Sequence, residues 1–255
     1  RSLCDWSSDV CSSDLNLNDV QVIGTRSFQY CDDLNNIGSL SNVTTIGSLA
    51  FYNCYSLTSV DLTSVTEIQV SAFYNCNNLQ SVSNLNSSLS KISNYTFSGC
   101  NSLTTINLSS VEEIFEQAFL GCNSLTSINL SAVNYLGSIV FSSCSSLSNV
   151  VLGSNLTTIF GQTFEHCTSL TTINLEYIER MLYYAFYGCN SLTSIDLSNI
   201  QEIGEGVFSD CSLSLVILGT SLTTIDSYAF GNNGIIDTFI FPIQFDWSNN
   251  SNVNN

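Results

Sequence analysis

The sequence predicts an α/β solenoid, a right-handed coil of about ten 22-residue units. We expect a parallel β-sheet on its concave face and short helical or 3₁₀ turns on its convex face. Three observations predict it: one phrase recurs at a spacing of 22 to 24 residues through the 255-residue chain, each copy centres on a phenylalanine, and each copy ends in alternating polar and apolar residues. A unit this small cannot bury its apolar face alone, so neighbouring units must stack.

Three columns of residues define the repeat. The phenylalanines are Phe28, Phe51, Phe73, Phe97, Phe119, Phe141, Phe164, Phe186, Phe208 and Phe230. An aliphatic residue or Met lies five residues before each: Ile23, Ile46, Ile68, Ile92, Ile114, Leu136, Ile159, Met181, Ile203 and Ile225. A cysteine follows nine of them by three residues: Cys31, Cys54, Cys76, Cys100, Cys122, Cys144, Cys167, Cys189 and Cys211. Because stacked units bring identical side chains together, we expect the Phe rings to stack in the core.

Each unit divides into two parts with different periodicities. In residues 125–130, LTSINL, Ser and Asn alternate with Ile and Leu, which predicts a short half-buried strand. One such strand per unit, always in the same direction, makes a parallel ladder with rungs about 4.8 Å apart. The other part, I-x-x-x-A-F-x-x-C, has apolar residues at intervals of three to five, which favours an inward-facing helical or 3₁₀ turn.

The two ends of the chain depart from the repeat. We interpret residues 1–15 as non-native, because CDWSSDVCSSDL at residues 4–15 resembles the translation of a sequencing-library adapter. A genuine polar N-terminal cap is the alternative. The solenoid is expected over residues 16–241. Residues 242–255 are rich in Asn and Ser, and we interpret them as a polar tail at a truncated end.

The charge excludes several classes of partner. The chain holds 4 basic and 21 acidic residues, for a net charge of −17. So few basic residues cannot neutralise a row of phosphates, so we predict no nucleic-acid partner. Anionic lipid is excluded on the same ground. The chain contains no run of 18 apolar residues, so we predict no direct insertion into a membrane.

The motif I-x-x-x-A-F-x-x-C-x-x-L-x-x-I-x-L resembles the BspA-like subclass of leucine-rich repeats, over about residues 22–241. The resemblance implies a leucine-rich-repeat solenoid, usually part of a larger cell-surface or secreted protein that adheres to host proteins or other cells. The sequence departs from the family at one position. Members commonly carry Pro after the strand, whereas this chain has Thr63, Ser109, Ser131 or Gly153 there.

The repeated cysteines do not indicate a cofactor or a metal site. One Cys per unit in the same orientation is typical of a small buried hydrophobic residue. The sequence has no C-x-x-C pair and only one His, so we predict no metal and no cofactor. Glu165, His166 and Cys167 are neighbours in sequence, but Cys167 belongs to the inward-facing column. We therefore predict that the chain is not an enzyme.

The outward-facing strand positions are the candidate ligand-binding residues of the concave face: Ser59, Asp61, Thr105, Asn107, Ser127, Asn129, Thr172, Asn174, Ser194 and Asp196. Such a surface could hydrogen-bond a glycan or an extended peptide. The same residue types also suit any solvated strand and form side-chain ladders. Six tyrosines lie next to the phenylalanine column, and their role is also open. They could anchor an interface or only cover backbone: Tyr52, Tyr74, Tyr95, Tyr184, Tyr187 and Tyr228.

These features predict a non-catalytic recognition module, surface-displayed or secreted, that binds a protein or glycan through the concave face in an adhesion-type role. The alternative is an intracellular protein-interaction scaffold or a structural spacer in a larger protein. Fold alone does not decide between them.

Overall fold

The computed structural model describes residue 15 and residues 17–241. Our interpretation of residues 1–15 as adapter-derived and of residues 242–255 as a polar tail therefore concerns residues that, apart from residue 15, lie outside this description.

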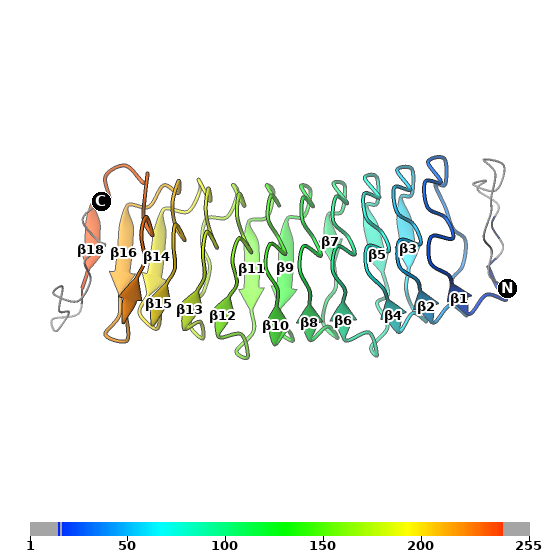
Figure 1. The fold of residues 1–255 in the computed structure, drawn as a ribbon, viewed down its shortest axis with the longest axis horizontal. Helices are drawn as coiled ribbons and strands as arrows, with labels where there is room; N and C mark the ends of the chain where they lie inside the picture. Colours follow the sequence, from blue (N-terminus) through cyan, green and yellow to red (C-terminus); the bar gives the residue numbers. More distant parts are fainter. Residues whose placement is uncertain (1–14, 16, 242–255) are drawn as a thin grey trace.

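The described chain is a β-solenoid whose units stand side by side in one row from β1 to β18 (Figure 1). Two rows of strands run along it. Row A follows the cysteines and contains β3 (Ser59–Asp61), β5 (Ser81–Ser83), β7 (Thr105–Ile106), β9 (Ser127–Leu130), β11 (Asn149–Leu152), β14 (Ser194–Leu197), β16 (Leu215–Leu218) and β18 (Thr238–Ile240). Row B precedes the phenylalanines and contains β1 (Val22–Ile23), β2 (Thr45–Ile46), β4 (Glu67–Ile68), β6 (Lys91–Ile92), β8 (Glu113–Ile114), β10 (Tyr135–Leu136), β12 (Thr158–Ile159), β13 (Arg180–Met181), β15 (Glu202–Ile203) and β17 (Thr224–Ile225).

Every strand pairing among the described residues is parallel and joins equivalent positions of successive units, as in Ile92 with Ile114. Row A divides into the sheets β3-β5-β7, β9-β11 and β14-β16-β18. Row B divides into β1-β2-β4, β6-β8-β10 and β12-β13-β15-β17. The solenoid of parallel strands is therefore confirmed. Row B is a feature that the sequence analysis did not predict.

The phenylalanine column forms the centre of the core. From Phe28 to Phe230 each ring stacks on the next, with centroids 5.2 to 5.7 Å apart and planes within 17° of parallel. The eight rings from Phe51 to Phe208 are fully buried. The predicted stack is confirmed, and it follows from the in-register pairing of successive units.

The predicted helical turns are wrong, and so is the α/β class. No helix occurs among residues 15 and 17–241, and so none that could cross a membrane. We call the seven residues from three before to three after each column Phe a Phe-centred turn. In these turns successive backbone N–H groups donate alternately to the next unit and to a carbonyl within the same turn. Phe119 N–H donates to the Val140 carbonyl of the next unit (3.0 Å), whereas Leu120 N–H donates back to Gln117 (3.2 Å).

Left-handed backbone explains why no helix forms. Each Phe-centred turn has positive φ two residues before and two residues after its Phe, as at Gln117 (φ 56°) and Gly121 (φ 72°) around Phe119. An α-helix needs negative φ at every residue, so two left-handed residues exclude it. They also turn alternate N–H groups toward the neighbouring unit. The apolar residues whose spacing suggested a helix thus face inward from a turn of a different conformation.

Ile139 is strained by this geometry and offers a test of it. Its φ is 61°, and it is the one β-branched residue at these positions in the described turns. A β-branched side chain is a clear outlier at positive φ, whereas Asn adopts this region readily. We expect Ile139→Asn to raise the free energy of unfolding by about 1 kcal/mol, measured by urea denaturation. Gln117→Asn is the matched change one unit earlier, and it should raise the free energy of unfolding by less. A larger increase for Gln117→Asn than for Ile139→Asn would contradict the strain argument.

One predicted strand is absent. Residues 171–175 lie between β11 and β14 but form no strand, so Thr172 and Asn174 do not lie on a row A strand as expected. Ile173, which should point inward between them, is only partly buried, whereas Ile106 and Ile128 at the same position of other units are buried. Neither β11 nor β14 pairs with residues 171–175, so this segment lacks the inter-strand hydrogen bonds that define a strand.

Candidate functional site

The row A face is the outward surface of the row A strands and of residues 171–175. All ten predicted binding residues lie at the molecular surface, with Ser127 and Ser194 partly covered and the other eight exposed. Among the described strands no two of the ten pair directly: Ser127 pairs with Asn149, and Asn129 pairs with the apolar Val151. Ser59 and Thr105 lie in line through Ser81 of β5. The breaks in row A leave the predicted residues in separate groups, and not in one continuous ladder.

Five Asn and Asp side chains of this face each close a local turn. Their Oδ1 atoms accept a hydrogen bond from the backbone N–H two residues later, at 2.9 to 3.1 Å, and the pairs are Asp61 with Thr63, Asn107 with Ser109, Asn129 with Ser131, Asn174 with Glu176 and Asp196 with Ser198. Such turns fix the side chain where the strand ends. Asn107 and Asn129 are exposed, so their amide NH₂ groups can still donate to a ligand.

These turns explain the missing proline. The N–H groups of Thr63, Ser109 and Ser131 donate to the side chain two residues earlier. Proline has no N–H, so Pro at this position and the side-chain turn are mutually exclusive. At Gly153 the residue two before is Val151, which has no acceptor in its side chain.

Asp61 is the most strongly held acid of the face. The Thr63 hydroxyl donates to Asp61 Oδ1 (2.5 Å) and Asn84 Nδ2 donates to Oδ2 (3.0 Å). The Thr63 hydroxyl is the main cause that lowers the pKa of Asp61, and Asn84 adds to it against the opposing effect of burial. Asp61 therefore carries a negative charge that is already partly satisfied within the protein.

The cysteine column is structural. The thiols of eight cysteines from Cys54 to Cys211 are free and buried, and each donates to the carbonyl of the Phe one unit before, at 3.0 to 3.2 Å. Burial raises the pKa of all eight, to about 12 for Cys54, Cys144 and Cys211. Cys31 is an exception, because it is disulfide-bonded.

Unit ten shows what the column needs. Asn233 replaces the cysteine, and its Nδ2 donates to the Phe208 carbonyl at 2.6 Å, the bond that a thiol makes in the other units. These units thus share, at this position, a side chain that donates to the carbonyl of the Phe one unit before. The sequence analysis found a cysteine in nine of the ten units and did not predict that Asn233 would make the equivalent bond in the tenth.

The structure gives the Glu165-His166-Cys167 neighbours separate environments. The Cys167 thiol points inward to the Phe141 carbonyl, and burial raises its pKa well above the ordinary value. His166 is exposed, and its ring lies edge-on to Tyr187 with centroids 5.1 Å apart. The pair therefore lacks the contact that a thiol–imidazole nucleophile requires. Over the described residues, no group of His, Cys, Asp and Glu is placed to hold a metal ion.

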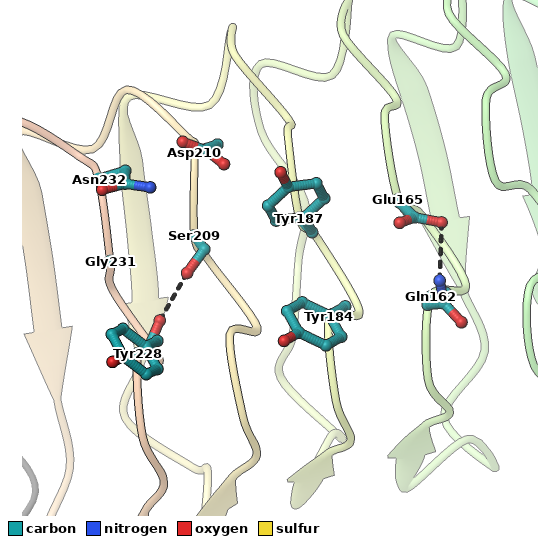
Figure 2. A pocket seen from close by; sticks show the side chains of 9 residues that line it. All are labelled: Gln162, Glu165, Tyr184, Tyr187, Ser209, Asp210, Tyr228, Gly231 and Asn232. Carbon is teal, nitrogen blue, oxygen red and sulfur yellow. Dashed lines mark hydrogen bonds between the residues drawn. The ribbon is translucent and has the colours of Figure 1, made fainter.

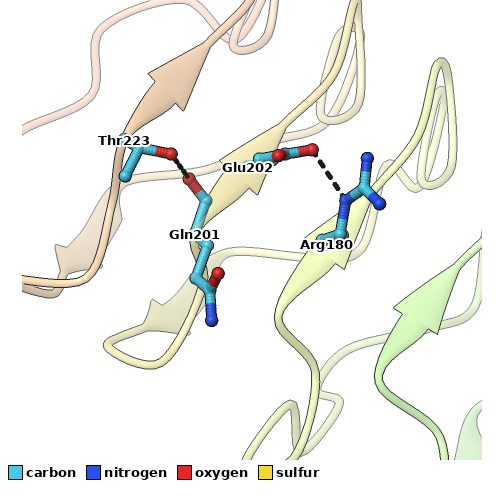
Figure 3. A network of polar contacts seen from close by, with 4 residues as sticks. All are labelled: Arg180, Gln201, Glu202 and Thr223. Atoms are coloured by element: carbon cyan, nitrogen blue, oxygen red, sulfur yellow. Dashed lines mark hydrogen bonds and ion pairs between the residues drawn. The ribbon is translucent and has the colours of Figure 1, made fainter.

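Two of the basic residues are paired with acids along row B. Arg180 Nε contacts Glu202 Oε2 at 2.7 Å across β13 and β15, close to the hydrogen bond from Thr223 to the Gln201 carbonyl (Figure 3). Lys91 Nζ contacts Glu113 at 2.7 Å across β6 and β8. Such exposed pairs stabilise by only about 0.2 to 1 kcal/mol. Their main effect is to leave the remaining surface more uniformly acidic.

A depression in the Phe-centred turns was not predicted. Figure 2 shows its side chains, which come from the turns of four successive units: Gln162, Glu165, Tyr184, Tyr187, Ser209, Asp210, Tyr228, Gly231 and Asn232. Its volume is about 430 Å³. The sequence analysis left the role of Tyr184, Tyr187 and Tyr228 open, and the structure brings these three together around one hollow.

The repeat, the solenoid and the stacked core agree with a known family. A family model described as BspA type leucine rich repeat region, in six copies, matches residues 8–109, 66–190 and 179–252. The chain belongs to the BspA-type leucine-rich repeat family. Leucine-rich repeat proteins are generally non-catalytic scaffolds for interaction.

Solved structures of bacterial proteins resemble this BspA-type chain. A leucine rich cell surface protein from Faecalibacterium prausnitzii is 26% identical, with a TM-score of 0.57, over 84% of this chain and 68% of its own. The leucine rich repeat protein of T. pallidum is 26% identical, with a TM-score of 0.50, over 69% and 73%. A leucine-rich repeat protein from Bacteroides ovatus is 28% identical, with a TM-score of 0.49, over 84% and 68%. A search of curated proteins found no match to this chain.

Proposed function

We propose that this BspA-type chain is a surface-displayed or secreted recognition module that binds a protein or a glycan through the row A face, the face expected to be concave, in an adhesion-type role. The observation that carries the proposal is the set of Ser, Thr, Asn and Asp side chains at equivalent surface positions of five units, such as Ser127 and Asn129 in unit five. The similar protein described as a leucine rich cell surface protein supports the location.

The row A face is suited to binding because its polar groups are already ordered. The turn that Asn129 closes with Ser131 (3.0 Å) fixes the side chain before a ligand arrives. Ordering a long side chain on binding costs about 0.5 to 1.5 kcal/mol, so preorganised groups bind more tightly. Within each row A sheet, parallel rungs about 4.8 Å apart also present side chains at a regular spacing that a short extended ligand can follow.

The test removes donors without removing the turns. In Asn107→Asp/Asn129→Asp, each carboxylate keeps the Oδ1 acceptor for Ser109 or Ser131, but the NH₂ donors are lost. We expect binding to a ligand selected from a glycan array or from immobilised extracellular proteins to fall at least tenfold, with an unchanged melting temperature. Surface plasmon resonance measures the affinity.

A charge-matched control is available in the same units. Asn101→Asp/Asn123→Asp adds the same charge at exposed residues outside the row A strands. It should leave the affinity unchanged. The proposal would be contradicted if both double variants lost the same affinity. It would also be contradicted if the row A variant bound every selected ligand as tightly as the wild type does.

A further inference from the structure

The depression exists because unit nine lacks the large side chains of the units beside it. Unit eight carries Tyr184 two residues before its Phe and Tyr187 one residue after it, whereas unit nine has Gly206 and Ser209 at these positions. A Cβ atom on Gly206 would lie 2.4 Å from Cε1 of Tyr184, so the tyrosine ring occupies the space above this glycine. The ring of Tyr184 thus fills the space that Gly206 leaves, and the short side chain of Ser209 leaves the hollow between the aromatic residues of units eight and ten.

Acidic side chains accompany two of the three tyrosines that wall the depression. The Tyr184 hydroxyl donates to Glu205 Oε1 at 3.2 Å, and this bond raises the pKa of Tyr184. The neighbouring Asp210 carboxylate likewise raises the pKa of Tyr187. A carboxylate has about four acceptor sites, so each acid keeps acceptors for a ligand. The third wall, Tyr228, is 62% exposed.

The ring arrangement leaves aromatic surface open. Tyr184 and Tyr187 meet edge to face, with centroids 5.7 Å apart and planes at 84°. Near the N-terminal end, Tyr52 and Tyr74 instead stack face to face at 4.9 Å and 5°, which covers the two facing surfaces. The edge-to-face arrangement thus places ring surface beside a hollow in which a ligand group can sit.

The charge of the depression favours a cation. Glu165 and Asp210 line it, and none of its lining residues is basic. The Gln162 amide, which could donate to a sugar hydroxyl, already donates to Glu165 Oε2 at 3.1 Å (Figure 2). The lining thus combines two carboxylates and aromatic faces with no basic group, which suits a cationic ligand better than a neutral one.

We propose that this depression binds an arginine side chain presented by a basic segment of a partner protein. A guanidinium group stacks on tyrosine faces by cation–π attraction and donates to carboxylates with its planar fork. Tyr184, Tyr187 and Tyr228 supply the faces, and Asp210 and Glu165 supply the acceptors. This site lies in the Phe-centred turns, apart from the row A face, so it is independent of the function proposed above.

The test uses a minimal probe on the full chain. An acetylated and amidated Gly-Arg-Gly-Arg-Gly peptide is titrated against the protein, with the tyrosine ring resonances followed by NMR. Its citrulline analogue has the same shape without the charge. We expect the arginine peptide to shift Tyr184, Tyr187 and Tyr228, and Tyr228→Ala and Asp210→Asn each to weaken binding about threefold to tenfold. Asn tolerates the positive φ of residue 210 (54°), so the second variant retains the turn.

Matched controls separate the site from general attraction to an acidic protein. Tyr30→Ala removes a tyrosine that is 60% exposed in the first unit, and Glu116→Gln removes one negative charge in unit five. Neither should change the affinity, and the Asn107→Asp/Asn129→Asp variant should bind the peptide as the wild type does. Equal weakening in these controls, equal binding of the citrulline peptide, or a neutral oligosaccharide that competes for the same tyrosines would overturn the proposal.

Discussion

Replacing Phe119 with Ala should lower the free energy of unfolding by about 3 to 5 kcal/mol. The ring is fully buried and lies between Phe97 and Phe141, with centroids 5.5 and 5.4 Å away. Its removal leaves a cavity bounded by two stacked rings that are fixed by the in-register units on either side. Since those units cannot close the gap without breaking their own backbone bonds, little relaxation is possible, and most of the loss should be observed.

Phe115→Ala is the matched control for this change. It removes the same side chain four residues earlier, where the ring is only half-buried and lies tilted against Tyr135 at 5.6 Å. Urea denaturation of both variants, followed by far-UV circular dichroism, should show a much smaller loss for Phe115→Ala. A Phe119→Ala protein with wild-type stability, or equal losses for the two variants, would show that the column does not carry the core.

The parts of the fold that depend on repetition could be predicted from sequence. The Phe stack and the buried cysteines follow from the spacing alone, because stacked units bring identical residues together. The outward direction of Asn107 and Asn129 follows from alternation along a strand. These predictions needed no knowledge of the turn conformation, which is why they are confirmed although the turn itself was wrong.

The left-handed turns could have been predicted from residues that were present but not used. Two residues after the Phe, eight of the ten units carry Gly, Asn, Asp or His, the types that most readily adopt positive φ: Asn53, Asn75, Gly99, Gly121, His166, Gly188, Asp210 and Asn232. A helix would not select these residues at one fixed position. Apolar spacing alone could not distinguish the two turns, because both face the same side chains inward.

Other features lie beyond any single unit. The letters TTINL occur at residues 104–108, where β7 forms, and again at residues 171–175, where no strand forms. The outcome is therefore set by neighbouring units and not by local sequence. The depression likewise arises from a difference between units, since Gly206 and Ser209 are unremarkable until they are aligned with Tyr184 and Tyr187.

Alkaline pH should unfold the protein through its cysteine column. Burial raises the pKa of Cys54, Cys144 and Cys211 from the ordinary value of 9.0 to about 12. The folded state therefore holds these protons more tightly than the unfolded state does. The stability they contribute is complete below pH 9 and is lost as the pH rises from 9 toward 12. In this window each thiol lowers the free energy of unfolding by about 1.4 kcal/mol per pH unit. These three thiols alone therefore lower it by about 4 kcal/mol by pH 10.

The pKa of the other five buried thiols is raised in the same direction, so the loss should be steep. Urea denaturation in the presence of a reductant, repeated between pH 7 and pH 10.5, measures the slope. Cys144→Ala should reduce the slope by about 1.4 kcal/mol per pH unit, because one titrating thiol is removed. It should also cost some stability at pH 7, since the donor to the Phe119 carbonyl is lost. A free energy of unfolding that stays constant to pH 10.5 would mean that the thiols titrate freely, and so that the column is open to water.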